Sequence, residues 1–132
     1  MNQKDIRWRQ RFENFEKSYR LLEQSVEIEK PSVVERAGLI QFFEITFELS
    51  WKLLKDYLES QEVVVKFPRE IIKSAFQYEL IENGDTWMDM LANRNLTVHT
   101  YDETKAVEIE MKIRNAFFPA ISRLYECMKT KT

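Results

Sequence analysis

The sequence has 132 residues, which suits one domain of ordinary size. Hydrophobic residues make up 44% and aromatic residues 13%, so the chain can bury a core without disulfides or a structural metal. Two glycines and three prolines are too few for the tight turns of a β-sandwich or barrel. Lysine and arginine number 20 against 22 acidic residues, a net charge of −2, so no overall basic field indicates nucleic acid.

A single cysteine, Cys127, excludes a disulfide framework, and with only one histidine present it also excludes a His/Cys metal site. We expect Cys127 to be a small buried hydrophobe in the last helix. The N-terminus has no apolar signal segment, and no apolar run reaches membrane-spanning length. We therefore expect one domain over residues 1–132 that is cytoplasmic, does not contact a membrane and needs no cofactor or metal.

Apolar residues at alternating intervals of four and three predict a long first helix that ends near Lys30-Pro31. The stripe consists of Trp8, Phe12, Phe15, Tyr19, Leu22 and Val26. The segment Ser32-Val33-Val34-Glu35 then has the pattern of a capping box. In this motif the Ser32 hydroxyl accepts from the amide of residue 35, and the Glu35 carboxylate accepts from the amide of Ser32. A second helix should begin here.

The second helix is far more apolar than the first, and its apolar residues cover most of its circumference. They are Leu39, Ile40, Phe42, Phe43, Ile45, Phe47, Leu49, Trp51, Leu53, Leu54, Tyr57 and Leu58. Such a helix is central to a bundle or is covered in part by another subunit. In so small a domain we expect both, and hence a dimer. Residues 62–67 favour a strand by composition, but no second strand is available to pair with them, so we expect an extended connector.

Two shorter helices should follow the connector. Pro68 suits the first turn of a third helix that extends to Leu80, and Asn83-Gly84 should end it, because glycine readily adopts the left-handed cap conformation. Asp85 or Thr86 can cap a fourth helix. We expect this fourth helix to carry Trp87, Met90 and Leu91.

The last helix should begin after a weakly helical stretch at residues 97–100. The segment Thr100-Tyr101-Asp102-Glu103 predicts a second capping box, and Pro119 should bend or interrupt the helix that follows. The sum is an all-α fold, an antiparallel up-and-down bundle of about five helices with short connections.

The residues around the single histidine are the best candidates for chemistry. Histidine is the residue type that exchanges protons near neutral pH, and His99 is preceded by Arg94 and Asn95 and followed by Tyr101. Five residues rotate by about 140° along a helix, so Arg94 and His99 converge only if the helix ends between them or each faces a partner subunit. His99 also precedes the N-terminus of the last helix, which would suit a phosphate unless Asp102 takes its amides instead.

Two carboxylates one turn apart, Glu44 and Glu48, lie on the apolar second helix and need partners if they are buried, and Arg94 is the obvious candidate. We therefore place Glu48 beside Asn95 as a supporting residue of the site. A purely structural alternative stays open, in which His99 is a capping or interface residue. Three basic residues flanking the first stripe could contact an RNA backbone, although we favour a solvated rim: Lys4, Arg7 and Arg11.

Two segments resemble a known family. Residues 94–101, Arg-Asn-Leu-Thr-Val-His-Thr-Tyr, resemble the signature of the HEPN superfamily, which has an arginine, a polar residue, a short spacer and a histidine. They match the stricter Arg-x4-His-x-Tyr form of the HepT toxins. Residues 43–55, from Phe43 to Lys55, are similar to proteins known as nucleotidyltransferase substrate-binding proteins, a branch of the same superfamily. The resemblance spans nearly the whole chain.

This resemblance implies an antiparallel helical bundle that dimerises, so that the Arg/His motifs of two protomers line one cleft. Its usual partner is a small nucleotidyltransferase of the MNT type. In toxin–antitoxin pairs the HEPN member is a metal-independent ribonuclease, with tRNA as one candidate substrate, and the MNT member silences it by adenylylating the motif tyrosine, here Tyr101. By the same resemblance Arg94 would stabilise the phosphate, His99 would transfer a proton to or from the ribose, and Asn95 would orient the site.

The leading hypothesis is thus a HEPN-type ribonuclease toxin with a composite site at a homodimer interface, neutralised by an MNT nucleotidyltransferase. The alternative is a non-catalytic subunit that binds substrate or nucleotide for a two-component nucleotidyltransferase. A purely structural dimer is a third hypothesis. Cleavage of RNA without metal separates the first from the others, and ligand binding in the same cleft separates the second from the third.

Overall fold

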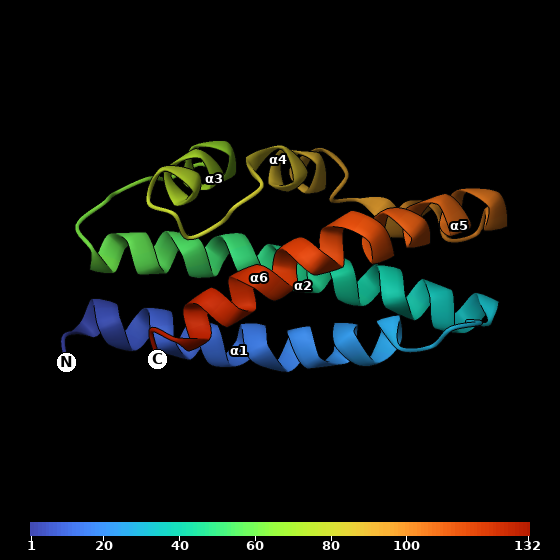
Figure 1. Ribbon diagram of the computed structural model, residues 1–132, viewed down its shortest axis with the longest axis horizontal. Helices are drawn as coiled ribbons and strands as arrows, with labels where there is room; N and C mark the ends of the chain where they lie inside the picture. Colours follow the sequence, from blue (N-terminus) through green and yellow to red (C-terminus); the bar gives the residue numbers. More distant parts are fainter.

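Long helices form the body of the molecule, which the computed structural model describes over residues 1–132 (Figure 1). Helices α1 (Gln3–Val26) and α2 (Val33–Ser60) run antiparallel along its length. The C-terminal segment, which contains α5 (Glu103–Lys112) and α6 (Phe118–Lys129), returns across both of them. The two chain ends therefore lie at the same end of the bundle, where Arg9 donates to the backbone oxygen of Thr132 at 3.0 Å.

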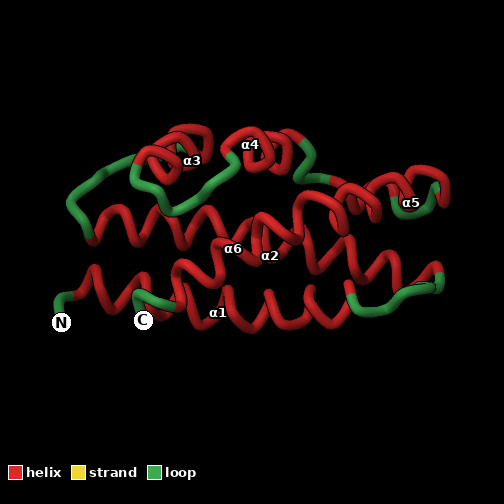
Figure 2. The backbone as a smooth tube through the Cα atoms, in the orientation of Figure 1, coloured by secondary structure: helices red, strands yellow, loops and turns green.

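Two short helices, α3 (Pro68–Gln77) and α4 (Gly84–Ala92), lie over α2 and are seen nearly end-on in Figure 1. A 3-10 helix, η1 (Leu96–His99), connects α4 to the C-terminal segment. Figure 2 contains helices and loops but no strand, and residues 62–67 form a connector as predicted. The predicted all-helical fold is confirmed. None of the helices combines the length and the apolar character needed to cross a membrane.

Helix α2 is the central helix of the bundle, as predicted from the apolar residues that cover most of its circumference. It packs against α1, α3, η1, α5 and α6. The ring of Phe43 in α2 stacks on the ring of Phe117 with centroids 5.1 Å apart. The ring of Phe47, also in α2, packs against Trp87 with centroids 6.1 Å apart. Not all of the apolar surface of α2 is covered within the chain, because Ile45 remains 41% exposed.

The start of α2 agrees with the sequence, whereas the start of α4 does not. Ser32 and Glu35 form the reciprocal capping box that was predicted. The expectation that Asn83-Gly84 ends α3 is wrong, because Gly84 is the first residue of α4. Asn83, rather than Asp85 or Thr86, caps α4 by accepting from the amide of Thr86. An asparagine next to a glycine signals a helix start as well as a helix end, so the pattern alone was ambiguous.

Helices α2 and α3 both end in a Schellman motif with a glutamate where glycine is favoured. Glu62 has φ 64° and Glu79 has φ 61°. After α3, the amide of Leu80 donates to the carbonyl of Ala75 and the amide of Glu79 donates to Phe76. The hydrogen bonds satisfy the last carbonyls of the helix, but a side chain in the left-handed region is strained.

The last helix differs from its prediction at the start and agrees with it in the middle. Asp102 caps α5 by accepting from the amide of Lys105, so the predicted capping box at Thr100-Tyr101-Asp102-Glu103 is wrong. Pro119 was predicted to bend or interrupt this helix, and a π-helical turn at Ile113–Phe117 does interrupt the α-helix directly before it. Proline lacks an amide and its ring crowds the carbonyl four residues earlier, and the wider π turn accommodates both.

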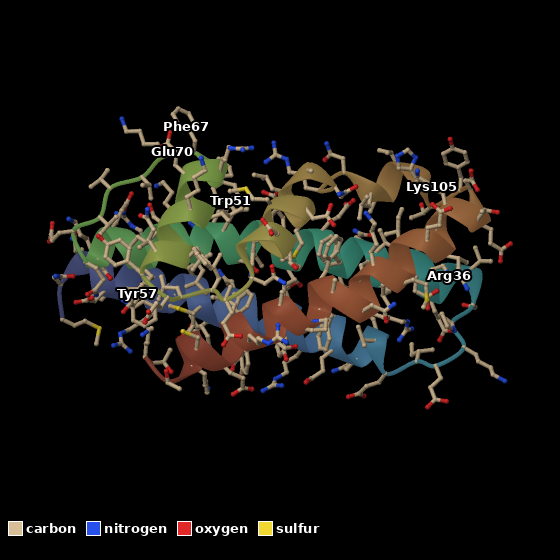
Figure 3. The ribbon with its side chains drawn as sticks, turned by 45° about the horizontal axis from the view of Figure 1, so that its top comes forward. Arg36, Trp51, Tyr57, Phe67, Glu70 and Lys105 are labelled. Atoms are coloured by element: carbon tan, nitrogen blue, oxygen red, sulfur yellow. The ribbon has the colours of Figure 1, made fainter.

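A buried ion cluster fixes the end of the bundle where α1, α2 and α5 meet. The Glu110 carboxylate accepts from Arg36 at 2.8 Å and from Arg114 at 2.7 Å, and Arg114 also donates to the carbonyl of Ile28 at 2.7 Å. Burial by itself raises the pKa of Glu110, but the hydrogen bonds from Arg36 and Arg114 outweigh it and hold the pKa below its ordinary value. Figure 3 shows Arg36 at this end of the molecule.

Candidate functional site

The Arg/His motif lies between helices rather than on one. Helix α4 ends at Ala92, where the Asn93 side chain donates to the Asp89 carbonyl at 2.8 Å and to its carboxylate at 2.7 Å. A turn over residues 93–95 follows, and η1 begins at Leu96. Asparagine, threonine and valine are weak helix formers, so nothing in this stretch favours continuing the α-helix. The helix thus ends before both motif residues, which removes the rotation of about 140° expected on a straight helix.

Helix α2 holds the motif in place through one carboxylate. Glu44 accepts from the backbone amide of Thr97 and from its hydroxyl, the latter at 2.9 Å. Thr100 donates through its hydroxyl to the carbonyl of Thr97 at 2.9 Å, and Leu96 is buried in the core. These contacts fasten η1 to α2 and leave Arg94 to project outward.

The predicted pairing of Arg94 with the two α2 carboxylates is wrong. Glu44 is occupied by Thr97, and Glu48 accepts from the indole nitrogen of Trp51 at 2.9 Å. No Asp or Glu oxygen lies within 4 Å of Arg94. Sequence spacing identified two carboxylates in need of partners, but it could not show that other donors would take them.

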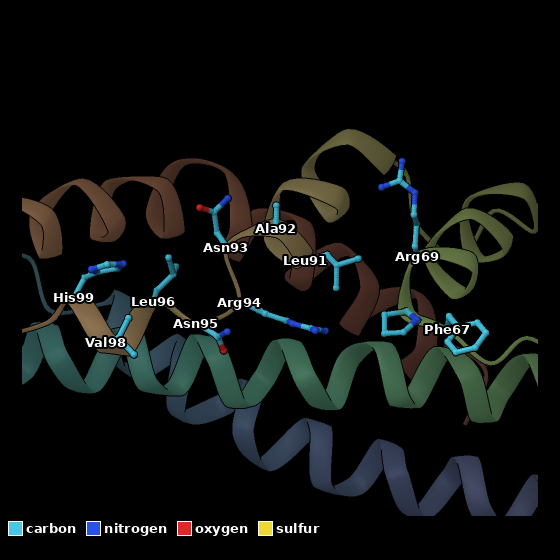
Figure 4. A pocket seen from close by; sticks show the side chains of 11 residues that line it. Phe67, Arg69, Leu91, Ala92, Asn93, Arg94, Asn95, Leu96, Val98 and His99 are labelled. Carbon is cyan, nitrogen blue, oxygen red and sulfur yellow. The ribbon is translucent and has the colours of Figure 1, made fainter.

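Arg94 and His99 line the same surface pocket, of about 640 Å³ (Figure 4). We call it the Arg–His pocket. Its walls come from the start of α3, the end of α4 and the motif itself, and consist of Phe67, Pro68, Arg69, Leu91, Ala92, Asn93, Arg94, Asn95, Leu96, Val98 and His99. The set holds two arginines and one histidine but no carboxylate. It is therefore suited to an anion.

Arg69 is the member of this pocket that sequence reasoning missed. It lies in the first turn of α3, 25 positions before Arg94 in the sequence, and no motif connects the two. Only the packing of α3 beside α4 brings it to the pocket. Neither Arg69 nor Arg94 has an acidic partner, so both guanidinium groups remain available to a ligand.

The two motif side chains do not touch each other within this chain. In Figure 4 Arg94 extends along α2 toward Phe67, whereas His99 lies at the opposite end of the pocket with Leu96 between them. Arg94 is exposed and His99 is half-buried. Asn95 lines the pocket as well, while Glu48 is not among its walls. A ligand that engages both motif side chains must therefore extend across the pocket.

Tyr101 lies outside the pocket walls and is 86% exposed. It follows η1 closely and precedes Asp102, the cap of α5. The Asp102 carboxylate occupies the N-terminus of α5 by accepting from the amide of Lys105, and its negative charge disfavours a phosphate there. Cys127 is half-buried against the core rather than fully buried.

The three basic residues of α1 that flank its apolar stripe, Lys4, Arg7 and Arg11, do not form a free cationic rim. Lys4 pairs with Glu62 at 3.4 Å, and Arg11 pairs with Asp56 at 2.9 Å. Arg7 lies 3.7 Å from a carboxylate oxygen of Glu59 in the same way. Since each of these cations faces a carboxylate, the three together offer little attraction to RNA.

The fold and the Arg–His pocket define an all-helical protein with a pocket whose charged side chains are all basic, and comparison with known proteins identifies its family. The family described as nucleotidyltransferase substrate binding protein like matches residues 10–130. The match covers most of the chain, so the protein belongs to this family. The resemblance to HepT-like HEPN proteins predicted from residues 94–101 is thereby confirmed at the level of family.

Known relatives agree with this assignment. A Haemophilus influenzae protein described as a probable ribonuclease HepT is 33% identical over 92 residues, which cover 64% of this chain and 63% of that protein. The match thus spans less than two thirds of that relative's length.

Solved structures share the fold over more of the chain. A protein of Thermus thermophilus superposes with a TM-score of 0.73 at 35% identity, covering 89% of this chain and 97% of that one. A structure from Haemophilus influenzae superposes with a TM-score of 0.78 at 29% identity, covering 89% of this chain and 98% of that one. It is described as revealing the fold of a substrate binding domain of a nucleotidyltransferase.

Proposed function

We propose that this protein is a HepT-type ribonuclease that cleaves RNA without a metal ion at the Arg–His pocket. The observation that carries the proposal is the pocket itself, which Arg94, Arg69 and His99 all line without a carboxylate among the walls. A phosphodiester is the anion that needs both a cation for its charge and a proton carrier for its cleavage.

In the proposed reaction the ribose 2′-hydroxyl attacks the adjacent phosphorus and the bond from phosphorus to the 5′ oxygen breaks. The products are a 2′,3′-cyclic phosphate and a free 5′-hydroxyl. Arg94 stabilises the extra charge on the phosphoryl oxygens, and His99 exchanges the proton. Asn95 orients the strand, and Arg69 adds a second cation at the far wall of the pocket. Glu44 does not touch the RNA in this proposal; it is a positioning residue that holds the motif through Thr97.

The reaction needs one group to accept a proton and another to donate one, whereas each chain holds a single histidine. A homodimer that brings two motifs together would supply the second. Support for a dimer comes from apolar surface beside the motif, where Ile45 is 41% exposed and Val98 is 61% exposed. Light scattering at micromolar concentration should give twice the chain mass of 16.0 kDa, and a monomeric mass would refute the composite site.

We further propose that an MNT-type nucleotidyltransferase silences the ribonuclease, as in a toxin–antitoxin pair, by adenylylating Tyr101. The Tyr101 hydroxyl would attack the α-phosphate of ATP and release pyrophosphate. The side chain is 86% exposed, so a second enzyme can reach it, and the adduct would place a negative charge next to the motif. Intact-mass analysis after incubation with the partner and ATP should show the adduct in wild type and not in Tyr101→Phe.

The deciding experiment is cleavage of bulk cellular RNA and tRNA in EDTA by protein whose Tyr101 is shown by mass to be unmodified. His99→Ala and Arg94→Ala should each lose about 100-fold or more of the activity, in the range expected for removing a proton carrier or a charge stabiliser. Arg123→Ala is the matched control, because Arg123 is an exposed arginine of α6 that lies outside the pocket. Circular dichroism should confirm that all four proteins are folded equally.

A second function has its own support. Arg94 and His99 point to different ends of the pocket in Figure 4, and the net charge of −2 is low for an RNA-binding protein. Both features fit a non-catalytic subunit that binds a nucleotide or another substrate for a nucleotidyltransferase. This function predicts no cleavage by wild type, together with saturable nucleotide binding that Arg94→Ala abolishes.

A further inference from the structure

The surface carries a second basic hollow besides the Arg–His pocket. It has a volume of about 290 Å³ and is lined by Arg11, Trp51, Lys52, Lys55, Asp56 and Lys66. We call it the lysine hollow. Lys66 lines this hollow and the next residue, Phe67, lines the Arg–His pocket, so the connector before α3 contributes to both depressions.

The lysine hollow carries cations that no carboxylate neutralises. Its one acidic residue, Asp56, is 5% exposed and is bound by Arg11 at 2.9 Å. Lys55 pairs with Glu59 at 3.0 Å. Lys52 and Lys66, in contrast, have no Asp or Glu oxygen within 4 Å.

This grouping is uneven for a chain with a net negative charge. Ten of the 20 lysines and arginines take part in ion pairs with Asp or Glu, which leaves ten without such a partner. Four of those ten, Lys52, Lys66, Arg69 and Arg94, line the two depressions. Each depression thus holds two cations that no carboxylate neutralises, and the connector before α3 contributes to both.

Aromatic side chains accompany these cations along the line from Lys52 through Lys66 to Arg94, which we call the path. Phe67 is 64% exposed and projects from the connector, and Figure 3 shows it at the edge of the molecule. Trp51 is half-buried, and Lys52 lies over its ring with the Nζ atom 5.7 Å from the centroid. Cations that follow a phosphate backbone, together with rings on which bases stack, are the combination used by proteins that bind single-stranded nucleic acid.

Two carboxylates lie near the path but do not line either depression. Glu48 is held by the indole nitrogen of Trp51, and Glu70 lies in the first turn of α3 beside Phe67 (Figure 3). Neither is a wall of the Arg–His pocket or of the lysine hollow. They can limit the overall affinity, but they leave the line from Lys52 through Lys66 to Arg94 positive.

We propose that single-stranded RNA reaches the Arg–His pocket along this path, with backbone phosphates on Lys52 and Lys66 and a base stacked on Phe67. The inference rests on the proposed ribonuclease function and deepens it, because it names the substrate as an extended single strand that occupies several nucleotides beyond the cleaved bond. A duplex would present its bases already stacked on each other, so the exposed ring of Phe67 favours a single strand.

The test measures RNA binding and does not depend on cleavage. It uses full-length His99→Ala protein, which should not cut the probe, and fluorescence anisotropy of a fluorescein-labelled decauridylate. Adding Lys52→Gln and Lys66→Gln should weaken binding at least about tenfold at about 0.1 M salt and lower the slope of log affinity against log salt by about 1.4, since each lost phosphate contact on a single strand contributes about 0.7. Phe67→Ala should weaken binding by about fivefold or more.

The matched control is the pair Lys17→Gln and Lys30→Gln in the same background. Both are exposed lysines without an acidic partner, on α1 and just beyond it, so they remove the same charge away from the path. They should change the affinity less than twofold. An equal loss in the control, or no loss in the Lys52/Lys66 variant, would overturn the proposed path. Equal affinity for a ten-base-pair RNA duplex would overturn the choice of a single strand.

Wild-type cleavage, measured separately, keeps the two proposals distinguishable. If wild type cuts no RNA while decauridylate binding still depends on Lys52 and Lys66, the ribonuclease proposal fails and the binding path stands. If wild type cuts RNA and the Lys52/Lys66 variant binds the probe as tightly as its background, the path fails and the ribonuclease stands.

Discussion

The carboxylate of Glu44 should control how firmly the Arg/His motif is held. It accepts from the amide and the hydroxyl of Thr97, and these are the only polar contacts that tie η1 to α2. Hydrogen bonds to a charged group contribute about 1.5–3 kcal/mol each. Glu44 is half-buried, so we take the lower value for each bond, which gives about 3 kcal/mol for the pair.

Glu44→Ala should therefore increase the population in which the segment around Thr97 is detached by roughly 100-fold, since about 1.4 kcal/mol corresponds to tenfold. Hydrogen exchange followed by NMR is the direct assay. The amides of Thr97 and Thr100 should exchange up to about 100-fold faster, while amides in the middle of α2 should change little. The melting temperature should fall less than this local effect suggests, because Leu96 remains buried in the core.

Glu48→Ala is the matched control, because it removes a carboxylate one turn further along α2 that binds only Trp51. It should leave the exchange of Thr97 and Thr100 unchanged. If Glu44→Ala exchanges like wild type at Thr97, or if Glu48→Ala accelerates it equally, then the contact does not hold the motif and the reasoning is refuted. RNA cleavage should fall about tenfold or more in Glu44→Ala, because catalysis depends on placement of the reacting groups within about 1 Å.

Three further predictions concern stability. Glu110→Gln should lower the free energy of urea unfolding by about 3 kcal/mol, the lower end for a buried pair that loses one partner, because Arg36 and Arg114 keep some solvent contact. The pKa of Glu110 is lowered in the folded state, so its ionised carboxylate stabilises the fold fully above the ordinary pKa of 4.5, and this stabilisation is lost as the pH falls below that value. In this acid range the free energy of unfolding of wild type should therefore fall more steeply with pH than that of Glu110→Gln. Parallel curves of unfolding free energy against pH would contradict the assignment. Glu79→Gly should raise the melting temperature by roughly 2–4 °C through relief of about 1 kcal/mol at φ 61°, whereas Glu79→Ala, which keeps a Cβ, should give no such gain.

The sequence was sufficient to predict the helices that depend on local signals. The stripe from Trp8 to Val26 defined α1, and Ser32 with Glu35 defined the start of α2. Both are encoded within one or two turns, where apolar spacing and capping chemistry act without help from the rest of the chain. The boundaries that were wrong lie where one local signal has two meanings, as at Asn83-Gly84.

The site was predictable only in part, for a related reason. Residues 94–101 are contiguous, so their pattern identified Arg94, His99 and Tyr101 and pointed to the family that the comparison confirms. Their arrangement was not predictable, because it depends on where α4 ends and on which group binds Glu44. The backbone amide of Thr97 competes for that carboxylate, and no side-chain pattern records a backbone donor.

By itself, then, the sequence determined an all-helical chain with a central apolar helix and an Arg/His motif near residue 99, because periodicity, capping and a contiguous motif are all local properties. Only the tertiary structure decided that Arg69 joins Arg94 in one pocket, that Lys52 and Lys66 line a second hollow, and that Lys4, Arg7 and Arg11 are neutralised by carboxylates at the end of α2 and just beyond it. Those relations join residues far apart in the chain. They arise from the packing of helices whose mutual positions are fixed by the shared core, which no local pattern specifies.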